Sequence, residues 1–387
     1  MRNDRNLSRR QFMAKSMAVA AATVVPRHVL GGAGHVPPSE QLNVAVIGTG
    51  GQGITNIKNL LTHQDVKISA ICDPAQFWDN SEFYYTHNSG RGPAMEVIED
   101  HYRRSPSEGS HDCQVYKDFR IMLERSGRDI DAVVVATPNH VHAVATMAAI
   151  RAGKGVYCEK PLTYSVYEAR RVAQAAREAK VGTQLGNQGH SSDDIRRAVE
   201  WVRDGAIGAI REVHCWAGEN RPQEFTERPK ETPPVPEGLD WDLWLGPAPE
   251  RPYHPAYVPM KWHYWWDFGN GKLGNFGCHT LDTAVWALDL EHPTLVEASS
   301  TPLNSETTPI ASTCHYKFPA RGALPPVDLY WYDGGIRPPR PECLELKRDL
   351  PRAGGSLLVG ETGAILSGIW SGSPRIIPET KMREYTL

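Results

Sequence analysis

The sequence predicts an α/β protein whose N-terminal half forms a doubly wound parallel sheet. Short apolar runs of strand type alternate with amphipathic, helix-like stretches, which is the pattern of βαβ units. The first run, residues 43–47, leads directly into a turn with four glycines at residues 48–53. Polar clusters follow the later runs, at positions where the carboxyl ends of parallel strands would gather.

The composition is that of a folded globular protein. With 387 residues, 40% apolar and 22% charged, the chain is long enough for two domains that each bury a core. A formal charge of −3 gives no electrostatic reason to expect nucleic acid or an anionic membrane as a partner. The seven cysteines lie far apart without a C-x-x-C pair, so they predict neither a structural zinc site nor a disulfide framework.

The first 35 residues have the layout of an export leader. S-R-R-Q-F-M at residues 8–13 precedes an Ala-rich apolar stretch and then small residues. The apolar stretch, residues 17–25, is too short to span a bilayer, so we expect no stable membrane anchor. The arginine pair closely resembles the twin-arginine consensus, with an ordinary basic leader as the alternative. We therefore expect export by the twin-arginine machinery, to the periplasm or otherwise out of the cytoplasm.

The glycine turn at residues 48–53 is the strongest local signal. A strand-type run precedes it, and residues 54–61 read as an amphipathic helix. Gly48 would allow the tight turn, Gly50 would let the backbone approach a pyrophosphate, and Gly53 would let helix pack on strand. The helix N-terminus would offer free N–H groups to the phosphates. The expected cofactor contacts of this turn are Gly48, Gly50, Gly51, Gln52 and Gly53.

Asp73 follows the next strand-type run, residues 66–72, twenty residues past Gly53. A carboxylate there can accept hydrogen bonds from the adenosine ribose hydroxyls and would repel a 2′-phosphate. The sequence therefore predicts NAD as cofactor in preference to NADP. A glycine-rich turn followed by a helix-capping aspartate is the alternative interpretation.

Polar clusters follow three further strand-type runs. They are T-P-N-H-V-H at 137–142, E-K-P at 159–161 and G-N-Q-G-H at 186–190. Ligands of open α/β sheets bind beyond the carboxyl ends of the strands. The expected cofactor contacts here are Thr137, Pro138, Asn139, His142, Glu159, Lys160, Asn187 and Gln188.

His140 and His142 could also begin a metal site, with His190 or His279 as a third ligand. The pair follows Thr-Pro-Asn at a strand end, however, where contacts to the nicotinamide ribose are expected. We therefore expect no metal.

The sequence resembles the glucose–fructose oxidoreductase, inositol dehydrogenase and rhizopine-catabolism (Gfo/Idh/MocA) oxidoreductases. The matching segments are V-I-G-T-G-G-Q-G (46–53), A-T-P-N-H-V-H (136–142), C-E-K-P-L-T (158–163) and G-N-G-K-L-G-N-F-G-C-H-T-L-D (269–282). The resemblance implies a Rossmann domain followed by an α/β domain with a large, mostly antiparallel sheet, with nicotinamide and substrate between them. We accordingly place a leader at 1–35, an NAD(P)-binding domain at 41–188 and a substrate and oligomerisation domain at 189–387.

The resemblance also implies roles for individual residues. Lys160 would contact the substrate hydroxyl that is oxidised or formed, and His279 would be the proton-transfer partner. Asn275 fills a position where many members carry aspartate, so we expect His279 to be less biased toward the imidazolium. Members usually end in a helix that packs back on the first domain, whereas this sequence stops at Leu387, which suggests a shortened C-terminus. A homo-oligomer is a further family expectation.

The residue types suit alcohol oxidation, which needs a group that takes the hydroxyl proton. Lys160 could be that base if burial lowers its pKa, or else a charged hydrogen-bond donor. His279 titrates nearer neutral pH. Asn275 lies four residues before it on the same helix face, and Asp282 lies three residues after it. The expected substrate contacts are Asn275, Asp282, His190 and Trp266.

Six of the eleven tryptophans fall between residues 241 and 286. Aromatic faces pack on the C–H faces of pyranoses, so this cluster suggests a carbohydrate pocket, with core packing or an oligomer interface as an equal alternative. The leading hypothesis is an NAD(P)-dependent oxidoreductase acting on a sugar, polyol or glycoside, with a tightly bound, internally recycled cofactor. The alternatives are a redox-neutral, NAD-dependent glycoside-cleaving enzyme, a dehydrogenase that uses free cofactor, and a non-catalytic sugar-binding relative.

Overall fold

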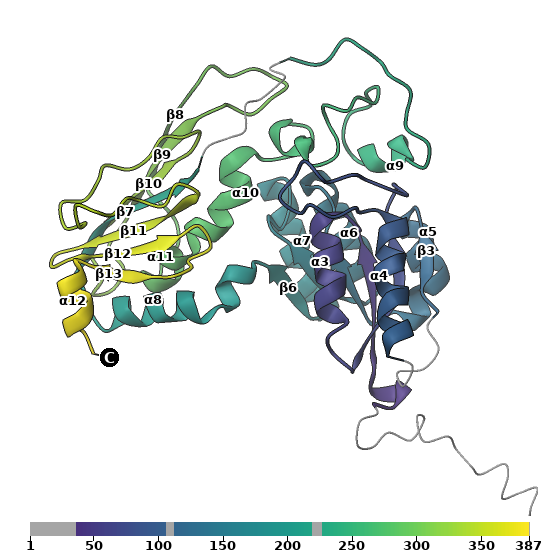
Figure 1. Ribbon diagram of the computed structural model, residues 1–387, viewed down its shortest axis with the longest axis horizontal. Coiled ribbons are helices and arrows are strands. Elements are labelled where there is room, and N and C mark those ends of the chain that lie inside the picture. Colours follow the sequence, from purple (N-terminus) through teal and green to yellow (C-terminus); the bar gives the residue numbers. More distant parts are fainter. Residues whose placement is uncertain (1–35, 106–111, 219–226, 387) are drawn as a thin grey trace, which may run out of the picture.

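The computed structural model describes residues 36–105, 112–218 and 227–386, which form two lobes (Figure 1). The predicted leader at 1–35 lies outside the described residues. The predicted fold class is confirmed: a six-stranded parallel sheet is followed by a seven-stranded, mostly antiparallel sheet. In the described part of the chain, no helix has the length and apolarity needed to cross a bilayer.

The first sheet has the strand order β3-β2-β1-β4-β5-β6, and every neighbouring pair is parallel. Its strands are β1 (Leu42–Ile47), β2 (Val66–Cys72), β3 (Gln114–Tyr116), β4 (Ala132–Val135), β5 (Gly155–Glu159) and β6 (Thr183–Gly186). The chain order reverses between β1 and β4, which places a ligand crevice beyond the carboxyl ends of those strands.

Helices cover both faces of this sheet and complete the two hydrophobic clusters of the domain. They are α3 (Gly51–Leu60), α4 (Arg91–Arg104), α5 (Phe119–Ser126), α6 (Asn139–Arg151) and α7 (Val166–Ala179), with short 3-10 turns η1 (Pro38–Glu40) and η3 (Gly127–Asp129). The strands β1, β2, β4 and β5 were predicted from their apolar runs, and β6 from the continuing alternation of strands and helices. β3 was not, because it has only three residues and none is buried.

The second sheet has the order β13-β12-β11-β7-β10-β9-β8, in which only the β7–β10 pair is parallel. Its strands are β7 (Ile210–Ala217), β8 (Leu295–Ser300), β9 (Ser312–Phe318), β10 (Val327–Tyr332), β11 (Gly354–Gly360), β12 (Ala364–Gly368) and β13 (Arg375–Ile377). The accompanying helices are η4 (Gln188–Ser191), α8 (Asp193–Arg203), α10 (Gly271–Thr280), α11 (Asp282–Ala287) and α12 (Glu379–Glu384).

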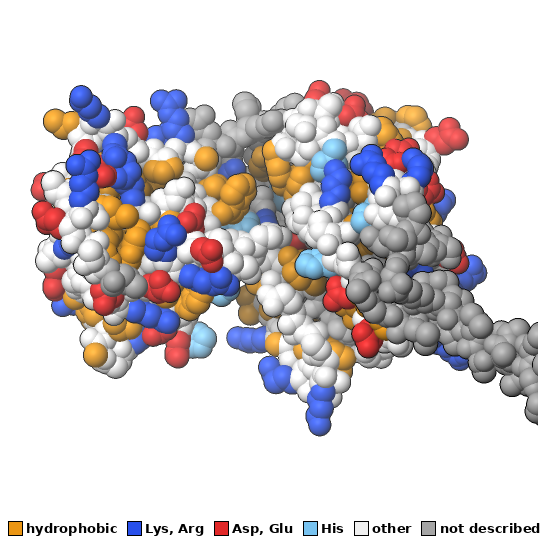
Figure 2. Space-filling model, turned by 60° about the horizontal axis from the view of Figure 1, so that its bottom comes forward, with side chains coloured by type: hydrophobic (Ala, Val, Ile, Leu, Met, Phe, Trp, Pro, Cys, Tyr) orange, Lys and Arg blue, Asp and Glu red, His pale blue; other side chains and the backbone are white. Residues whose placement is uncertain are grey.

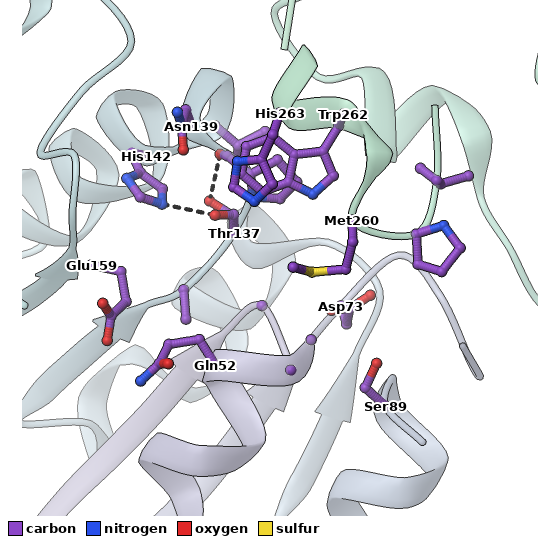
Figure 3. A pocket seen from close by; sticks show the side chains of 18 of the residues that line it. Gln52, Asp73, Ser89, Thr137, Asn139, His142, Glu159, Met260, Trp262 and His263 are labelled. Carbon is purple, nitrogen blue, oxygen red and sulfur yellow. Dashed lines mark hydrogen bonds between the residues drawn. The ribbon is translucent and has the colours of Figure 1, made fainter. Parts of the chain in front are cut away.

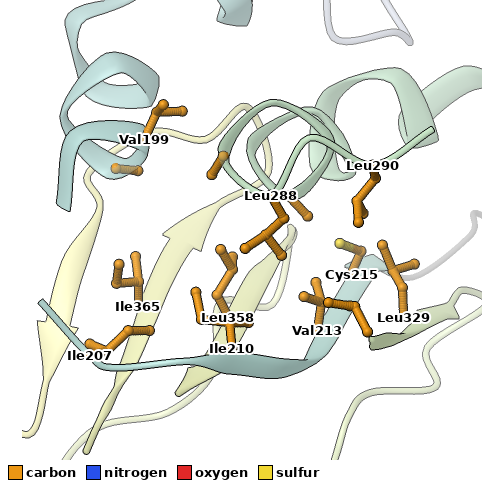
Figure 4. Packing of buried hydrophobic residues seen from close by; sticks show 14 of the residues in the cluster. Val199, Ile207, Ile210, Val213, Cys215, Leu288, Leu290, Leu329, Leu358 and Ile365 are labelled. Atoms are coloured by element: carbon orange, nitrogen blue, oxygen red, sulfur yellow. The ribbon is translucent and has the colours of Figure 1, made fainter. Parts of the chain in front are cut away.

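One face of the second sheet packs against α8 and the end of α11 (Figure 4). Val199 of α8 meets Leu288 and Leu290 above the inward side chains of β7, including Val213 and Cys215. This core fixes α10 and α11 at the edge that faces the first domain. The last helix, α12, packs on β13 of the second domain, where the Tyr385 ring contacts Trp201.

Residues 227–270 form an excursion from the second domain, which we call the arm. It carries α9 (Trp241–Leu245) and η5 (Lys261–Tyr264), and α9 lies over the Rossmann domain in Figure 1. The arm has its own aromatic core, in which Trp241 and Trp244 stack at 4.8 Å and Trp265 is buried. Core packing, one of the two interpretations, is therefore observed for Trp241, Trp244 and Trp265.

Backbone hydrogen bonds fasten the arm to the first domain just beyond β2. The Gln76 N–H donates to the Gly238 carbonyl at 2.9 Å, and the Asp240 N–H donates to the Pro74 carbonyl at 3.0 Å. Further along, the ring of His140 of α6 packs between Trp244 and Phe268 in two tilted contacts. Because these contacts lie on both sides of the crevice, the arm covers the carboxyl ends of the parallel strands.

Candidate active site

A single cavity of about 1000 Å³ runs between the two domains and the arm. It contains the glycine turn, the end of β2, Lys160 and His279. Figure 3 shows Met260, Trp262 and His263 of the arm facing Gln52, Asp73 and Glu159 of the Rossmann domain. The groove between the lobes is also visible in the space-filling view, where acidic and basic side chains are interspersed over both lobes (Figure 2).

The glycine turn has the shape that a pyrophosphate requires. Gly48 has φ +90°, and a Cβ there would lie 2.6 Å from the Ala136 carbonyl carbon. A Cβ on Gly53 would lie 2.0 Å from the Gly48 carbonyl oxygen, so both positions exclude side chains. Gly50 has no protein atom within 4 Å of its Cβ position and opens onto the cavity. No side chain caps the first turn of α3, so its N–H groups are available to an anion.

Asp73 is buried at the end of β2 and is held rigidly. Its carboxylate accepts hydrogen bonds from the N–H groups of Thr49 at 2.8 Å and Ala75 at 2.9 Å. Burial raises the pKa of Asp73, while these two N–H groups and the nearby Arg91 favour the ionised form. A carboxylate has further lone pairs, so Asp73 can still accept hydrogen bonds from a ribose diol.

A buried polar chain connects the glycine turn to Glu159. The Tyr85 hydroxyl donates to Gln52, Gln52 donates to Asn56, and the Asn56 amide donates to Glu159 at 2.9 Å. The amide of Gln188 reaches the same carboxylate at 2.8 Å. Glu159 is thus fixed at the cavity wall, where its remaining lone pairs can meet a ribose hydroxyl.

Tyr85 was not predicted as a site residue, since nothing in its local pattern marks it. Its ring packs on the first turn of α3, where a Cβ on Gly51 would approach it to 2.1 Å. The Gly51 position therefore has to be glycine because of Tyr85. Tyr84 stacks on Tyr85 at 4.2 Å and also lines the cavity.

The cavity is also lined by Thr137, Pro138, Asn139 and His142, which are the predicted cofactor contacts of this cluster. Both ring nitrogens of His142 lie against backbone carbonyls, Nδ1 at 2.6 Å from Pro161 and Nε2 at 2.7 Å from Thr137. The imidazole therefore fixes the backbone around the E-K-P segment. Over the described ranges, no three His, Cys, Asp or Glu side chains cluster in a way that could hold a metal ion.

Lys160 extends from the end of β5 toward α10. Its Nζ donates to the Asn275 carbonyl at 2.9 Å and to the Asn275 side-chain oxygen at 2.7 Å. Burial lowers the pKa of Lys160, whereas the two acceptor oxygens favour the ammonium form. An ammonium group has three donors, so one N–H remains for a ligand in the cavity. This geometry suits a charged hydrogen-bond donor better than a base.

His279 is buried on α10, and its Nδ1 lies 2.8 Å from the side-chain oxygen of Asn187. Burial, with Lys160 as a second cause, lowers the pKa of His279 to about 3, so the ring is neutral at physiological pH. With Nδ1–H donated to Asn187, the proton-free Nε2 is available to accept a proton.

The neighbours of His279 differ from the expectation. Asn275 contacts Lys160, and the residue that orients the imidazole is Asn187. Asn187 is itself held by the Cys278 carbonyl and by Asp282, each at 2.9 Å. Asp282 also pairs with His190, whose ring stacks on Trp286. Asn187, Asp282 and His190 thus lie behind His279 as supports and not on the cavity wall.

Trp266 also differs from its predicted position, since it does not line the cavity. Its backbone N–H donates to Glu306 and its carbonyl accepts from the Tyr164 hydroxyl, which turns residue 266 toward the domain boundary. The tryptophans that line the cavity are Trp78, Trp244, Trp262 and Trp370. Trp370 forms an edge contact with His279 at 6.2 Å and is more than half exposed.

One cavity holds a glycine turn at a helix N-terminus, a buried acid after β2 and a lysine–histidine pair. These features define an NAD-binding oxidoreductase of the Rossmann class. Comparisons with known proteins agree. Residues 42–187 match the Gfo/Idh/MocA family model for the oxidoreductase NAD-binding Rossmann fold, and residues 214–320 match its C-terminal alpha/beta domain. Together the two matches cover more than half of the sequence. The chain belongs to the Gfo/Idh/MocA oxidoreductase family.

Individual relatives differ in what their names describe. A glycosyl hydrolase family 109 protein of Stenotrophomonas maltophilia is 28% identical over 212 residues, which are 55% of this chain and 42% of that protein. A 1,5-anhydro-D-fructose reductase of Ensifer adhaerens is 53% identical over 92 residues, which are 22% of this chain and 27% of the relative. The chain thus matches less than half the length of each of these relatives.

The fold is also found in solved structures. The WlbA dehydrogenase of Bordetella pertussis, solved with NADH and UDP-GlcNAcA, superposes with a TM-score of 0.57 at 17% identity. The superposition covers 87% of this chain and 83% of that one. At this level of sequence identity, the comparison shows a shared fold alone.

Proposed function

We propose that this protein is an NAD-dependent oxidoreductase that acts on a CH–OH group of a sugar, polyol or glycoside. The observation that carries the proposal is the convergence of Lys160 and His279 on the cavity that also contains the glycine turn and Asp73. The names of family relatives, which include a sugar reductase and a glycosyl hydrolase, support a carbohydrate substrate. Asp73 favours NAD over NADP.

In this scheme each residue of the site has one task. The third N–H of Lys160 binds the reacting hydroxyl oxygen and stabilises negative charge that develops on it. Nε2 of His279 takes the hydroxyl proton, since Asn187 fixes the ring with its proton on Nδ1. NAD, when bound, supplies the acceptor for the hydrogen and electron pair that leave the carbon. The reverse sequence returns the proton from His279 to a ketone product.

We further propose that the cofactor is held tightly and recycled in place. The arm crosses the cavity, and Met260, Trp262 and His263 line it opposite the glycine turn. A cofactor beneath this cover would leave only after the arm contacts at Gly238 and Asp240 open. Internal recycling would also suit a protein acting where free NAD is scarce.

Recycling permits a second outcome at the same site, which the relative named as a glycosyl hydrolase favours. Transient oxidation at one carbon would acidify the neighbouring C–H, so that this proton and the aglycone could leave together as an alcohol. Water would then add across the resulting double bond, and return of the hydrogen and electron pair to the ketone would restore the original hydroxyl. The overall reaction would then be redox-neutral. A nitrophenyl glycoside distinguishes this outcome from simple alcohol oxidation. Release of the aglycone by the as-purified protein, without added NAD, would indicate redox-neutral cleavage.

The experiment that tests the proposed function is reduction of the bound cofactor, followed at 340 nm while a panel of sugars is added. A rise limited to one equivalent per chain supports a recycled cofactor. Sustained growth only with excess NAD would identify a dehydrogenase that uses free cofactor. Release of no nucleotide on denaturation, together with no response to added NAD, would instead favour a sugar-binding relative without turnover.

We also propose export by the twin-arginine machinery and assembly into a homo-oligomer. The sequence Ser8-Arg9-Arg10-Gln11-Phe12 supports the first, and the fully exposed edge strand β8 supports the second. Fractionation of cells that express the full chain, with Arg9→Lys/Arg10→Lys as the control, tests location. Light scattering of the purified protein tests assembly.

A further inference from the structure

Lys272, in the first turn of α10, is a second lysine in the cavity. It is half-buried, lines the cavity wall, and places its Nζ 4.7 Å from the centroid of the Phe276 ring. Lys160 places its Nζ over the same ring, at 5.9 Å. Two ammonium groups therefore flank one aromatic side chain and can reach the same ligand.

Among the residues that the structure describes, Lys272 forms neither a hydrogen bond nor an ion pair. The acid that influences it electrostatically is Asp333. The carboxylate of Asp333 is already engaged, because it accepts from the Ser312 N–H, the Ser312 hydroxyl and the Trp331 indole N–H. Asp333 is moreover buried, with 3% of its surface exposed.

Removing a charged group from water costs free energy unless an opposite charge comes close to it. The half-buried ammonium group of Lys272 therefore favours a ligand that carries an anionic group. Burial lowers the pKa of Lys272, and an incoming anion would restore its charged form. The phenyl face of Phe276 provides a cation–π contact but no charge neutralisation.

We propose that Lys272 binds an oxyanion substituent of the substrate, so that the natural substrate is an anionic sugar carrying a carboxylate or a sulfate ester. Lys160 then engages the reacting hydroxyl, and Lys272 engages the anion at another position of the same ring. The inference rests on the proposed function and specifies its substrate class.

The test compares matched pairs on the as-purified protein: glucuronate with glucose, galacturonate with galactose, and glucose 6-sulfate with glucose. Binding is measured by the fluorescence of the cavity tryptophans, and chemistry by reduction of bound NAD at 340 nm. We expect at least one anionic sugar to bind about 10- to 100-fold more tightly than its neutral partner, as for a charge-assisted contact. The carboxylate and sulfate arms show which oxyanion the site takes.

In Lys272→Met this preference should fall to within about threefold, and Lys272→Arg should restore most of it. Lys117→Met is the matched control. Lys117 lines the same cavity but follows β3 at the edge of the first sheet, so its loss should leave the preference ratio intact.

Equal binding of charged and neutral sugars by the unmodified protein would overturn the inference, as would an unchanged preference in Lys272→Met. Loss of bound NAD in Lys272→Met with the sugar preference retained would also overturn it, by assigning the lysine to the pyrophosphate. The proposed function fails separately, if no sugar of either charge reduces the cofactor.

Discussion

The side-chain oxygen of Asn187 lies 2.8 Å from Nδ1 of His279 and fixes which imidazole nitrogen carries the proton. Asn187 follows the last strand of the first domain, whereas His279 lies on α10 of the second. The tautomer of the proton acceptor therefore depends on the contact between the two domains. Any motion that separates them would also remove the orientation of the base.

Asn187→Leu should lower the turnover of the site by about 10²-fold, because the imidazole loses its oriented Nδ1–H. Asn187→Asp should instead raise the pKa of His279, since a carboxylate beside the ring favours the imidazolium. Rates measured against pH should show the active limb of the aspartate variant displaced to higher pH. Identical pH profiles for the two variants would contradict the orienting role.

Lys160→Met should reduce turnover by about 10²- to 10⁴-fold, through loss of the charged donor at the reacting oxygen. The bound nucleotide should be retained, because the glycine turn and Asp73 are untouched. Nucleotide content by absorbance and single-turnover reduction at 340 nm provide the two readouts. Asn275→Ala is the companion variant, and we expect a smaller loss since it removes one of two acceptors.

Asp73→Ala should weaken NAD binding and narrow the discrimination against NADP. The carboxylate would no longer accept from the ribose diol or repel a 2′-phosphate. Titration of nucleotide-depleted protein with NAD and NADP measures both effects. A variant that still strongly prefers NAD would show that discrimination arises elsewhere in the cavity.

Arg251→Met should speed cofactor release by loosening the arm. The guanidinium is buried, lies over the rings of Tyr257 and Phe268, and pairs with Asp267 and Glu306. Removing one partner of a buried ion pair lowers stability by about 3–5 kcal/mol. The arm should therefore open more often in the variant. The rate at which bound NAD exchanges with added labelled NAD is the measurement. An unchanged exchange rate in a folded variant would mean that the arm does not retain the cofactor.

Buried histidines should make the fold acid-sensitive. Burial lowers the pKa of His140 to about 4 from an ordinary 6.5, so the unfolded chain takes up this proton first as the pH falls. The contribution of His140 to the free energy of unfolding is therefore complete above pH 6.5. It falls by on the order of 3 kcal/mol as the pH drops toward 4. Urea unfolding at pH 7 and pH 5 measures the loss. His140→Phe, which keeps an aromatic ring between Trp244 and Phe268, should flatten this dependence.

The sequence was most informative where local chemistry determines local structure. The turn at Gly48, Gly50 and Gly53 could be predicted, because strand, glycines, helix and the acid at residue 73 lie within one continuous segment. The strands β1, β2, β4 and β5 could be predicted from their apolar runs, and β6 from the alternation of strands and helices, whereas β3 buries no residue and could not. Lys160 and His279 could be connected only through the family resemblance, since 119 positions separate them in the chain.

The sequence was least informative where partners come from distant segments. Helix spacing pairs Asn275 with His279, but the fold turns the Asn275 oxygen to Lys160 and brings Asn187 from another domain. Composition could not show that Trp265 fills the core of the arm while Trp262 faces the cavity. The contact of Tyr85 with Gly51 depends on how residues 74–90 cross the glycine turn, which no local pattern determines.

The central claim is that the cavity between the glycine turn and Lys160 holds NAD and uses it on a carbohydrate. Mass analysis of nucleotide released from the denatured, as-purified protein tests this most directly. We expect close to one NAD per chain, and reduction of that NAD in the intact protein when a substrate sugar is added. Protein that releases no nucleotide and fails to bind added NAD would contradict it.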